Sequence, residues 1–329
     1  MIPRKQAGNQ TRKYYTDPLE LLERLNLTPE QILFSPEAAQ QFHFKVPAAY
    51  VDKIQPGTPD DPLLRQIFPV QQELSPNPDY QQDPLGEADS LSQPGLLQKY
   101  QGRALLLVTP GCAINCRYCF RRHYPYDDKG HFWRQIENNV HLLKQDPSIS
   151  EVILSGGDPL SLSDNKFTDL LTLLKSIAHL KRVRIHTRFP VVEPERITKQ
   201  LLNTFSMSGL RIIMVLHINH AREMGSDNQL ALARLHAHRI TLFNQSVLLK
   251  GVNDSVETLA QLSETLLEHH IIPYYLHMLD KVKGSAHFAI SDKEAINLYQ
   301  QLRAVLPGYM LPRLVREIPG ENSKLPVIA

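Results

Sequence analysis

The three cysteines of the chain, Cys112, Cys116 and Cys119, lie within eight residues. An odd number of cysteines this close together is a poor basis for disulfides, and clustered thiolates are typical metal ligands. Three thiolates can bind three irons of a [4Fe–4S] cluster and leave the fourth iron open to a small molecule. The main alternative is a zinc ion bound by the three cysteines and His123. Zinc modules usually take their ligands from two separate loops, so the compact spacing favours the cluster.

The cysteine loop needs elements to position it, and it directly follows an apolar segment that is typical of a β-strand. Six such segments occur, at 103–109, 151–155, 182–187, 211–218, 240–249 and 271–279. The segments between them, such as 164–179 and 255–269, carry apolar residues at three- and four-residue spacing, which is typical of helices. Alternating strands and helices predict an α/β fold of parallel βαβ units. The alternation alone leaves an open sheet and a barrel as alternatives.

Residues 1–99 differ from this pattern and predict an N-terminal extension. Helix-start signals at Asp17-Pro18 and at Ser35-Pro36-Glu37 predict two short helices. Eight prolines between residues 56 and 94 interrupt helices and remove sheet donors. We expect that stretch to be an extended connector that wraps over the surface, with a domain boundary near Tyr100.

The composition excludes several classes of function. The 36 basic and 34 acidic side chains of the 329 residues nearly cancel and form no long block of one sign, so we expect no binding to nucleic acid or membranes. No apolar run approaches the roughly 20 residues that a transmembrane helix needs, and the N-terminus resembles no secretory signal. These features predict a cytoplasmic enzyme that acts on a small molecule.

The cysteine spacing, with Tyr118 before the last cysteine, resembles the CxxxCxxC signature of the radical S-adenosylmethionine (radical SAM) superfamily. A second signature of that superfamily, a turn that holds the methionyl amino group, is similar to Ser155, Gly156, Gly157 and Asp158. The resemblance implies a partial (β/α)6 barrel that binds a [4Fe–4S] cluster and S-adenosylmethionine (SAM). In this superfamily one electron from the cluster cleaves SAM to a 5′-deoxyadenosyl radical.

Longer segments resemble one family of this superfamily, the lysine 2,3-aminomutases. They are 116–124, 155–160, 187–198, 244–254 and 273–280. The resemblance implies an isomerase that converts L-α-lysine to β-lysine by moving the α-amino group to the β-carbon. It also implies pyridoxal phosphate as a further cofactor, bound through a lysine in a C-terminal turn. Here that lysine is Lys324 in the segment 307–329, which leaves 100–306 as the radical SAM core.

The same resemblance assigns substrate-binding residues. Arg121 would bind the substrate carboxylate, which suits a planar guanidinium because it can form two parallel hydrogen bonds. Asp280 and Glu317 would bind the ε-ammonium group of lysine, which needs a charged partner when it is buried. Glu317 stands where the family has aspartate, so it keeps the charge and adds one methylene. The alternative interpretation of all three is that they are solvated surface charges.

Further cofactor-binding residues are implied in the same way. Arg188 would hold the phosphate of pyridoxal phosphate, and His217, Asn244 and Gln245 would line the adenosyl and pyridoxal sites. Considered without the resemblance, an arginine at such a strand end, like Arg188, is commonly a surface ion-pair partner. A histidine on an apolar strand, like His217, is more often a buried core residue. These four roles therefore depend on the family and not on the spacing.

The chain lacks the additional cysteines and the C-terminal tail of the longer aminomutases, and it ends five residues after Lys324. This pattern resembles the short branch of the family, which makes β-lysine for the modification of elongation factor P. The resemblance implies a functional link to that factor and to its lysyl ligase. It also implies an electron donor such as flavodoxin or ferredoxin, and we expect a homo-oligomer in which the N-terminal extension contacts a neighbouring subunit.

Other functions are consistent with parts of the pattern. An arginine aminomutase would also place acidic residues against a cationic side chain, whereas Asp280 and Glu317 would repel glutamate. A non-catalytic iron–sulfur protein would need only the cysteines and would leave the glycine turn and Lys324 without a role. Free lysine and lysine attached to a protein are both possible substrates.

Overall fold

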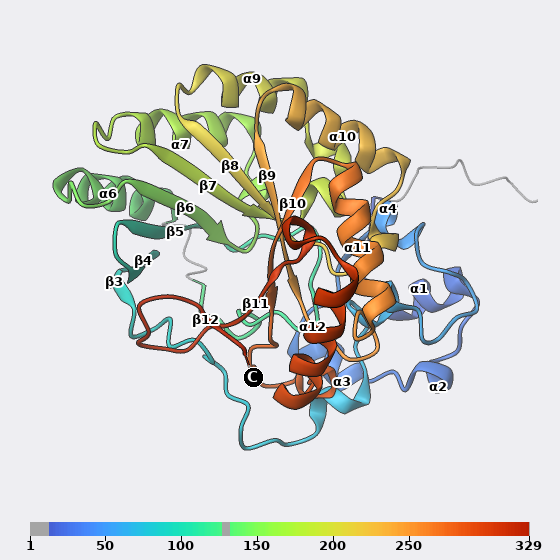
Figure 1. The fold of residues 1–329 in the computed structure, drawn as a ribbon. Helices are drawn as coiled ribbons and strands as arrows, with labels where there is room; N and C mark the ends of the chain where they lie inside the picture. The colour runs from blue at the N-terminus through green and yellow to red at the C-terminus, as the bar shows by residue number, and fades with distance from the viewer. Residues whose placement is uncertain (1–12, 127–131, 329) are drawn as a thin grey trace, which may run out of the picture.

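The computed structural model describes residues 13–126 and 132–328. Within these ranges one sheet has the strand order β12-β11-β10-β9-β8-β7-β6-β5-β4-β3, and a smaller sheet pairs β1 with β2 (Figure 1). Neighbouring strands from β5 to β11 are parallel, whereas the pairs β3–β4, β4–β5 and β11–β12 are antiparallel. The large sheet is open, because β3 and β12 form its two edges and do not pair with each other.

In the described residues the strands are β1 (Tyr14–Tyr15), β2 (Val46–Pro47), β3 (Leu91–Gln93), β4 (Leu96–Tyr100), β5 (Arg103–Thr109), β6 (Glu151–Gly156), β7 (Arg182–Thr187), β8 (Arg211–Leu216), β9 (Thr241–Val247), β10 (Ile271–His277), β11 (Arg313–Arg316) and β12 (Leu325–Pro326). The α-helices are α1 (Pro18–Leu25), α2 (Pro29–Ile32), α3 (Pro36–Gln41), α4 (Ala48–Val51), α5 (Pro62–Arg65), α6 (Phe132–Gln145), α7 (Asp164–Lys175), α8 (Phe189–Val192), α9 (Lys199–Met207), α10 (Ser226–Ala237), α11 (Val256–Glu268) and α12 (Asp292–Val305). The 3₁₀ helices are η1 (Gln71–Leu74), η2 (Pro159–Ser161), η3 (Pro194–Arg196), η4 (Ala221–Glu223), η5 (Ala286–Phe288) and η6 (Gly308–Met310). None of the helices in these two ranges is long and apolar enough to cross a membrane.

The six predicted strands are present as β5 to β10, and helices connect them as the alternation predicts. The helices α6, α7, α9 and α10 lie along the outer side of the sheet (Figure 1). The Ser163 hydroxyl accepts the backbone N–H of Lys166 at the start of α7, and Ser255 accepts that of Thr258 at the start of α11. Such caps satisfy backbone donors that a helix leaves unpaired at its N-terminus. The predicted α/β fold is confirmed.

The N-terminal extension contributes to the core of the sheet. The two short helices expected there are present as α1 and α3. The expectation of a connector that only wraps over the surface is wrong in part, because Leu63, Leu64, Ile67 and Phe68 of the proline-rich stretch are at most 1% exposed. These side chains belong to the same apolar core as residues of β5 to β10. Burial of four large apolar side chains fixes this stretch against the sheet.

The sheet also crosses both predicted domain boundaries. The strands β3 and β4 come from the predicted extension, and β11 and β12 come from the predicted C-terminal segment. Tyr100, at the expected boundary, is the last residue of β4, and β4 pairs with β5. The division at residues 99 and 306 therefore stays a proposal, and the three segments share one sheet.

The glycine turn after β6 packs directly on the backbone that leads into the cysteine loop. The amide of Gly157 donates to the Thr109 carbonyl at 2.7 Å, and the amide of Asp158 donates to the Gly111 carbonyl at 2.7 Å. A Cβ atom on Gly157 would lie 2.3 Å from the Gly111 oxygen, and one on Gly156 would lie 2.4 Å from the Thr109 oxygen. Gly156 also has a φ of +124°, which favours glycine. Close backbone approach therefore explains both glycines.

This contact predicts that Gly157→Ala moves the cysteine loop and destabilises the protein. We expect the free energy of unfolding to fall by about 1–3 kcal/mol, the usual range for overpacking a buried contact. Urea unfolding followed by circular dichroism measures the change. Gly308→Ala is the matched control, because a Cβ atom there would have no neighbour within 4 Å. Equal stability of the two variants would contradict the packing argument.

Candidate active site

The carboxyl ends of the parallel strands meet at one edge of the sheet, where open α/β sheets commonly bind ligands. A cavity of about 460 Å³ extends from one face of the sheet to this edge. Its walls include side chains from all three predicted segments, among them Lys99, Cys116 and Lys324. The predicted site residues that line it are Cys112, Cys116, Cys119, Arg121, Ser155, Gly156, Gly157, Asp158, Arg188, His217, Gln245, Asp280, Glu317 and Lys324. The structure thus brings together every predicted site residue except Asn244.

Backbone contacts tie the cysteine loop to the N-terminal extension. The Lys45 ammonium donates to the carbonyl of Cys112 at 2.7 Å, and the amide of Asn115 donates to the Lys45 carbonyl at 3.0 Å. The amide of Arg117 donates to the Gln66 carbonyl at 2.9 Å. The side chain of Arg117 is fully buried and pairs with Glu73 at 2.7 Å. The extension therefore fixes the loop on one side while the glycine turn fixes it on the other.

The three thiols of the cysteine loop line the cavity, and their chemistry suits a [4Fe–4S] cluster. Such a cluster takes thiolate ligands, and each cysteine binds a different iron. Burial raises the pKa of Cys112, and it raises that of Cys119 to about 11, a cost that bound iron would offset by favouring thiolates.

The carboxylate of Asp158 joins the ends of β6 and β7. It accepts the Thr187 hydroxyl at 2.7 Å, the backbone amide of Arg188 at 2.6 Å and that of Leu160 at 3.1 Å. Burial raises the pKa of Asp158 to about 6, although these hydrogen bonds act in the opposite direction. The side chain therefore holds the strand ends in place at the wall of the cavity, and its expected contact with a methionyl amino group stays a prediction.

The guanidinium of Arg121 is buried in a two-point ion pair with Glu87. Its Nε and Nη2 atoms lie 2.7 and 2.8 Å from the two carboxylate oxygens. The remaining Nη1 atom donates to the Ser155 hydroxyl at 2.7 Å and to the Gly156 carbonyl at 3.2 Å. Burial alone acts to lower the pKa of Arg121, but the charge of Glu87 outweighs it and raises the pKa. Arg121 is thus a fixed cation in the cavity wall, beside the glycine turn.

Another part of the cavity combines two carboxyl groups with two lysines. The ammonium group of Lys324 forms an ion pair with Glu317, and Lys99 donates to the other oxygen of that carboxylate at 3.0 Å. Burial acts to raise the pKa of Glu317, but Lys324 and Lys99 together lower it to about 2. Burial and the nearby charge of Glu317 raise the pKa of Asp280 to about 7. Glu317 is therefore an anion at neutral pH, whereas Asp280 is near its midpoint.

Side chains in the same cavity as Lys324 fit pyridoxal phosphate. The Nε2 atoms of His186 and His277 and the Nε atom of Arg103 are buried and have no hydrogen-bond partner in the described structure. Burial lowers the pKa of both histidines well below its ordinary value, so both rings are neutral. Buried polar atoms without partners indicate a ligand with complementary groups. A lysine amine, neutral imidazoles and a cationic arginine suit an aldehyde, a pyridine ring with polar substituents and a phosphate.

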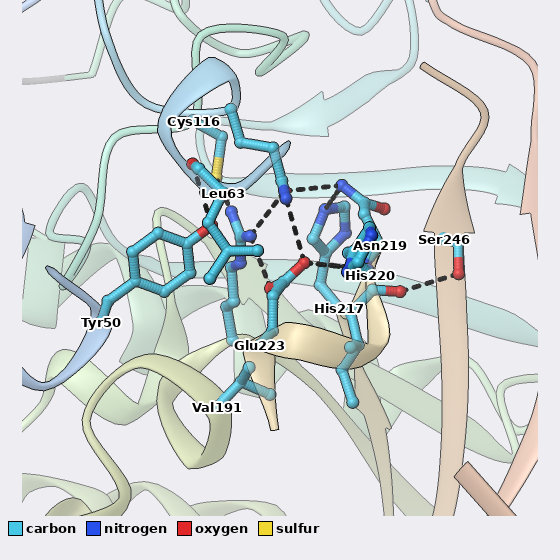
Figure 2. Close-up of polar contacts among 12 residues, drawn as sticks. Tyr50, Leu63, Cys116, Val191, His217, Asn219, His220, Glu223 and Ser246 are labelled. Atoms are coloured by element: carbon cyan, nitrogen blue, oxygen red, sulfur yellow. Dashed lines mark hydrogen bonds and ion pairs between the residues drawn. The ribbon is translucent and has the colours of Figure 1, made fainter. Parts of the chain in front are cut away.

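The guanidinium of Arg188 contacts the cysteine loop. Its Nη1 atom donates to the Sγ atom of Cys116 at 2.8 Å and to the Tyr118 hydroxyl at 3.1 Å. Its Nη2 atom lies 2.7 Å from both the Gln66 amide oxygen and a Glu223 carboxylate oxygen. Figure 2 shows Cys116 and Glu223 within this network. Protein groups accept from both Nη atoms, whereas the Nε atom of Arg188 is buried and has no hydrogen-bond partner in the described structure. The cofactor-phosphate contact that the resemblance implies for Arg188 stays a prediction.

The remaining three predicted residues differ in their placement. His217 stacks on Tyr118 with 5.7 Å between the ring centroids, and burial lowers its pKa to about 3. Gln245 lines the cavity, but Asn244 is 2% exposed and does not. The Asn244 amide binds the backbone N–H and carbonyl of Ile218 at 2.9 and 3.0 Å. The expected cofactor contact of Asn244 is therefore corrected, because successive strand residues face opposite sides and Asn244 faces away from the cavity.

Sequence reasoning missed several residues of the site. Five of them line the cavity, namely Glu87, Lys99, Arg103, His186 and His277, and two bind Arg188, namely Gln66 and Glu223. A signal existed for His186, because β7 alternates buried residues with the partly exposed Arg182, Arg184 and His186. Such period-two alternation places one set of side chains on one face of the sheet. Gln66 and Glu87 had no such signal, since they lie in irregular parts of the extension.

The chain is similar to known proteins over most of its length. The model of the radical SAM superfamily matches residues 106–262. The chain is 48% identical over 313 residues to the L-lysine 2,3-aminomutase of Escherichia coli (strain K12), covering 95% of this chain and 91% of that protein. It is 43% identical over 309 residues to that of Haemophilus influenzae (94% and 91% covered) and 33% identical over 310 residues to that of Clostridium subterminale (94% and 74% covered). The chain therefore belongs to the L-lysine 2,3-aminomutase family of radical SAM isomerases.

Proposed function

We propose that this chain converts L-α-lysine to β-lysine with a [4Fe–4S] cluster, SAM and pyridoxal phosphate. The observation that carries the proposal is the single cavity that holds the three cysteines, Lys324 and the two carboxyl groups. When bound, the cluster and SAM supply a carbon radical that abstracts hydrogen, and pyridoxal phosphate supplies a conjugated ring that allows nitrogen to migrate. The protein must hold these groups and lysine in one enclosure that keeps out water.

The charges of the cavity match the two ends of lysine. Arg121 offers a guanidinium to the α-carboxylate, and Asp280 and Glu317 offer negative charge to the ε-ammonium group. The cationic end of lysine needs such a partner, because burying an unpaired ammonium costs several kcal/mol. The identity to curated lysine aminomutases supports lysine over other amino acids. Arginine, which is also cationic, is the comparison that tests this choice.

Lys324 is the residue that we propose to bind pyridoxal phosphate. A lysine attacks an aldehyde only as the neutral amine, so it must first lose a proton. In the structure Lys324 is partly buried and its ammonium pairs with Glu317. Lys99 binds the other oxygen of the same carboxylate at 3.0 Å, so Glu317 would keep one cation if Lys324 lost its charge. We also propose that His217 and Gln245 line the adenosyl and pyridoxal sites. The turn at residues 155–158 would hold the methionyl amino group of SAM.

We also propose that the β-lysine serves the modification of elongation factor P in the cytoplasm, together with the lysyl ligase of that factor. The matched region covers 91% of the Escherichia coli relative but only 74% of the Clostridium subterminale relative. In length the chain is therefore more similar to the shorter relative, which supports the proposal. We further propose a flavodoxin or ferredoxin as electron donor and a homo-oligomeric state. These proposals rest on the similarity to the short branch of the family.

The reaction itself is the central test. Protein purified without oxygen, loaded with cluster, SAM and pyridoxal phosphate and reduced with dithionite should form β-lysine from L-lysine, as measured by chromatography and mass spectrometry. Cys112→Ala, Cys116→Ala and Cys119→Ala should each lose this activity and most of the bound iron. L-arginine should react at least about ten-fold more slowly. Protein with a full cluster that cleaves SAM but leaves lysine unchanged would exclude the proposal, and faster turnover of arginine would favour the arginine alternative.

The covalent role of Lys324 predicts where borohydride fixes pyridoxal phosphate. After reduction and proteolysis, mass spectrometry should find the pyridoxyl group on the peptide that contains Lys324. Lys324→Arg keeps the charge but cannot condense with an aldehyde, because a guanidinium stays protonated. This variant should lose the label and retain its iron. Recovery of the label on Lys250, Lys281 or Lys283 would show that the assignment is wrong.

Asp280 predicts a pH dependence of lysine turnover. Its pKa of about 7 means that the carboxyl gains negative charge as the pH rises from 6 to 8. Because the ε-ammonium group binds the anion, kcat/KM for lysine should rise over this range. Asp280→Asn should abolish this rise and lower kcat/KM by about 10- to 100-fold, or about 1.4–2.8 kcal/mol. Asp292→Asn, which removes a charge from an exposed ion pair with Arg316, is the matched control. It should change neither the rise with pH nor the value of kcat/KM. An unchanged profile in Asp280→Asn would rule out this role.

A further inference from the structure

A charged side chain contacts one of the three cysteine sulfurs directly. Arg188 follows the end of β7, and its Nη1 atom lies 2.8 Å from the Sγ atom of Cys116. The side chain of Arg188 is 6% exposed, so water does not compete for this contact. An N–H group of a guanidinium that points at a thiolate is a charge-assisted hydrogen bond, which is stronger than a neutral one.

The position of this guanidinium is fixed by partners from distant parts of the chain. Its Nη2 atom binds Glu223 in η4 and Gln66 of the N-terminal extension, each at 2.7 Å. Glu223 is fully buried, and its second oxygen accepts the backbone N–H groups of Asn219 at 2.9 Å and His220 at 3.1 Å (Figure 2). Both charges of the pair therefore lie behind the cysteine loop in a fixed geometry, with Arg188 between Glu223 and Cys116.

The two charges act on a cluster in opposite directions. Reduction of a [4Fe–4S] cluster by one electron makes it more negative, and hydrogen bonds to the cysteine sulfurs and nearby positive charge stabilise that state. Arg188 supplies both. Glu223 supplies negative charge, and it also neutralises part of the charge of Arg188. The low dielectric of a buried site strengthens both effects.

We propose that Arg188 is a positioning residue that sets the reduction potential of the cluster through its hydrogen bond to Cys116, and that Glu223 opposes it. Arg188 raises the potential, so that a low-potential donor can deliver the electron that SAM cleavage requires. Glu223 keeps the potential from rising so far that the reduced cluster no longer passes the electron on. This inference rests on the proposed cluster, and it gives Arg188 a role in place of the expected contact with the pyridoxal phosphate group.

The test is a redox titration of the cluster, monitored by electron paramagnetic resonance, in the iron-loaded full chain without SAM. Arg188→Gln removes the charge and should make the cluster harder to reduce, by at least about ten-fold in the reduction equilibrium, or about 59 mV for one electron. Glu223→Gln removes the opposing charge while its amide oxygen can still accept from Asn219 and His220, so the potential should shift upward. A purely structural role would not move the two variants in opposite directions.

Two further variants control for folding and for charge. Arg196→Gln breaks a comparable partly buried ion pair with Asp164, which does not line the cavity, and its potential should match the wild-type value. Arg188→Lys keeps the charge but offers one donor group in place of the planar guanidinium, so its potential should lie between wild type and Arg188→Gln. If Arg188→Gln fails to retain iron, opposite shifts in Arg188→Lys and Glu223→Gln still support the inference, and their absence refutes it.

The outcomes separate this inference from the proposed function. Wild-type protein that binds no cluster would refute the proposed function and with it the role of Arg188. A cluster whose potential is unchanged in Arg188→Gln and Glu223→Gln, with β-lysine still formed by wild type, would refute only the role of Arg188. Pyridoxal phosphate content is measured in the same samples. Loss of that cofactor from Arg188→Gln, with an unchanged potential, would return Arg188 to the phosphate-binding role.

Discussion

A charge that leaves water for the interior costs several kcal/mol unless a partner of opposite sign is already in place. This constraint organises the cavity, where Arg121 faces Glu87, Arg188 faces Glu223 and Lys324 faces Glu317. Glu87 comes from the extension and Arg121 from the cysteine loop, and Arg188 and Glu223 follow different strands. Glu317 and Lys324, in contrast, are seven residues apart. The first two pairs form only when distant parts of the chain pack together, so electrostatic pairing and folding are linked at this site.

The same constraint explains why the N-terminal extension is part of the site. It provides Glu87 to Arg121 and Gln66 to Arg188, and its Lys45 holds the carbonyl of Cys112. Its proline-rich stretch buries four large apolar side chains in the core of the sheet. Apolar burial thus provides the free energy that places polar groups at fixed positions in the cavity wall. A cluster-binding loop held only by its own short turns would lack such fixed partners.

The sequence predicted what depends on local patterns. Apolar runs and cap residues predicted β5 to β10 and the starts of α7 and α11, because strand and helix signals are carried within about 20 residues. The contacts of Asn244 and Arg188 could not be predicted this way. Their partners, such as Glu223, lie elsewhere in the chain, and family resemblance gives a position without giving the atoms around it. The burial of the proline-rich stretch was missed for a related reason, since proline content indicates an irregular backbone but not its burial.

The cavity contains protein groups that resemble the ends of the proposed substrate. Arg121 binds a carboxylate of the protein, and Glu317 binds an ammonium of the protein. Binding of lysine would therefore exchange one set of ion pairs for a similar set, and the net electrostatic gain from each exchange is small because the original pairing is lost. Discrimination must then come from the distance between the two ends and from Asp280, whose charge changes near neutral pH. Glu87, the partner that the substrate carboxylate would displace from Arg121, keeps Lys99 at 3.8 Å as a counter-charge, which lowers the cost of leaving this buried carboxylate without Arg121.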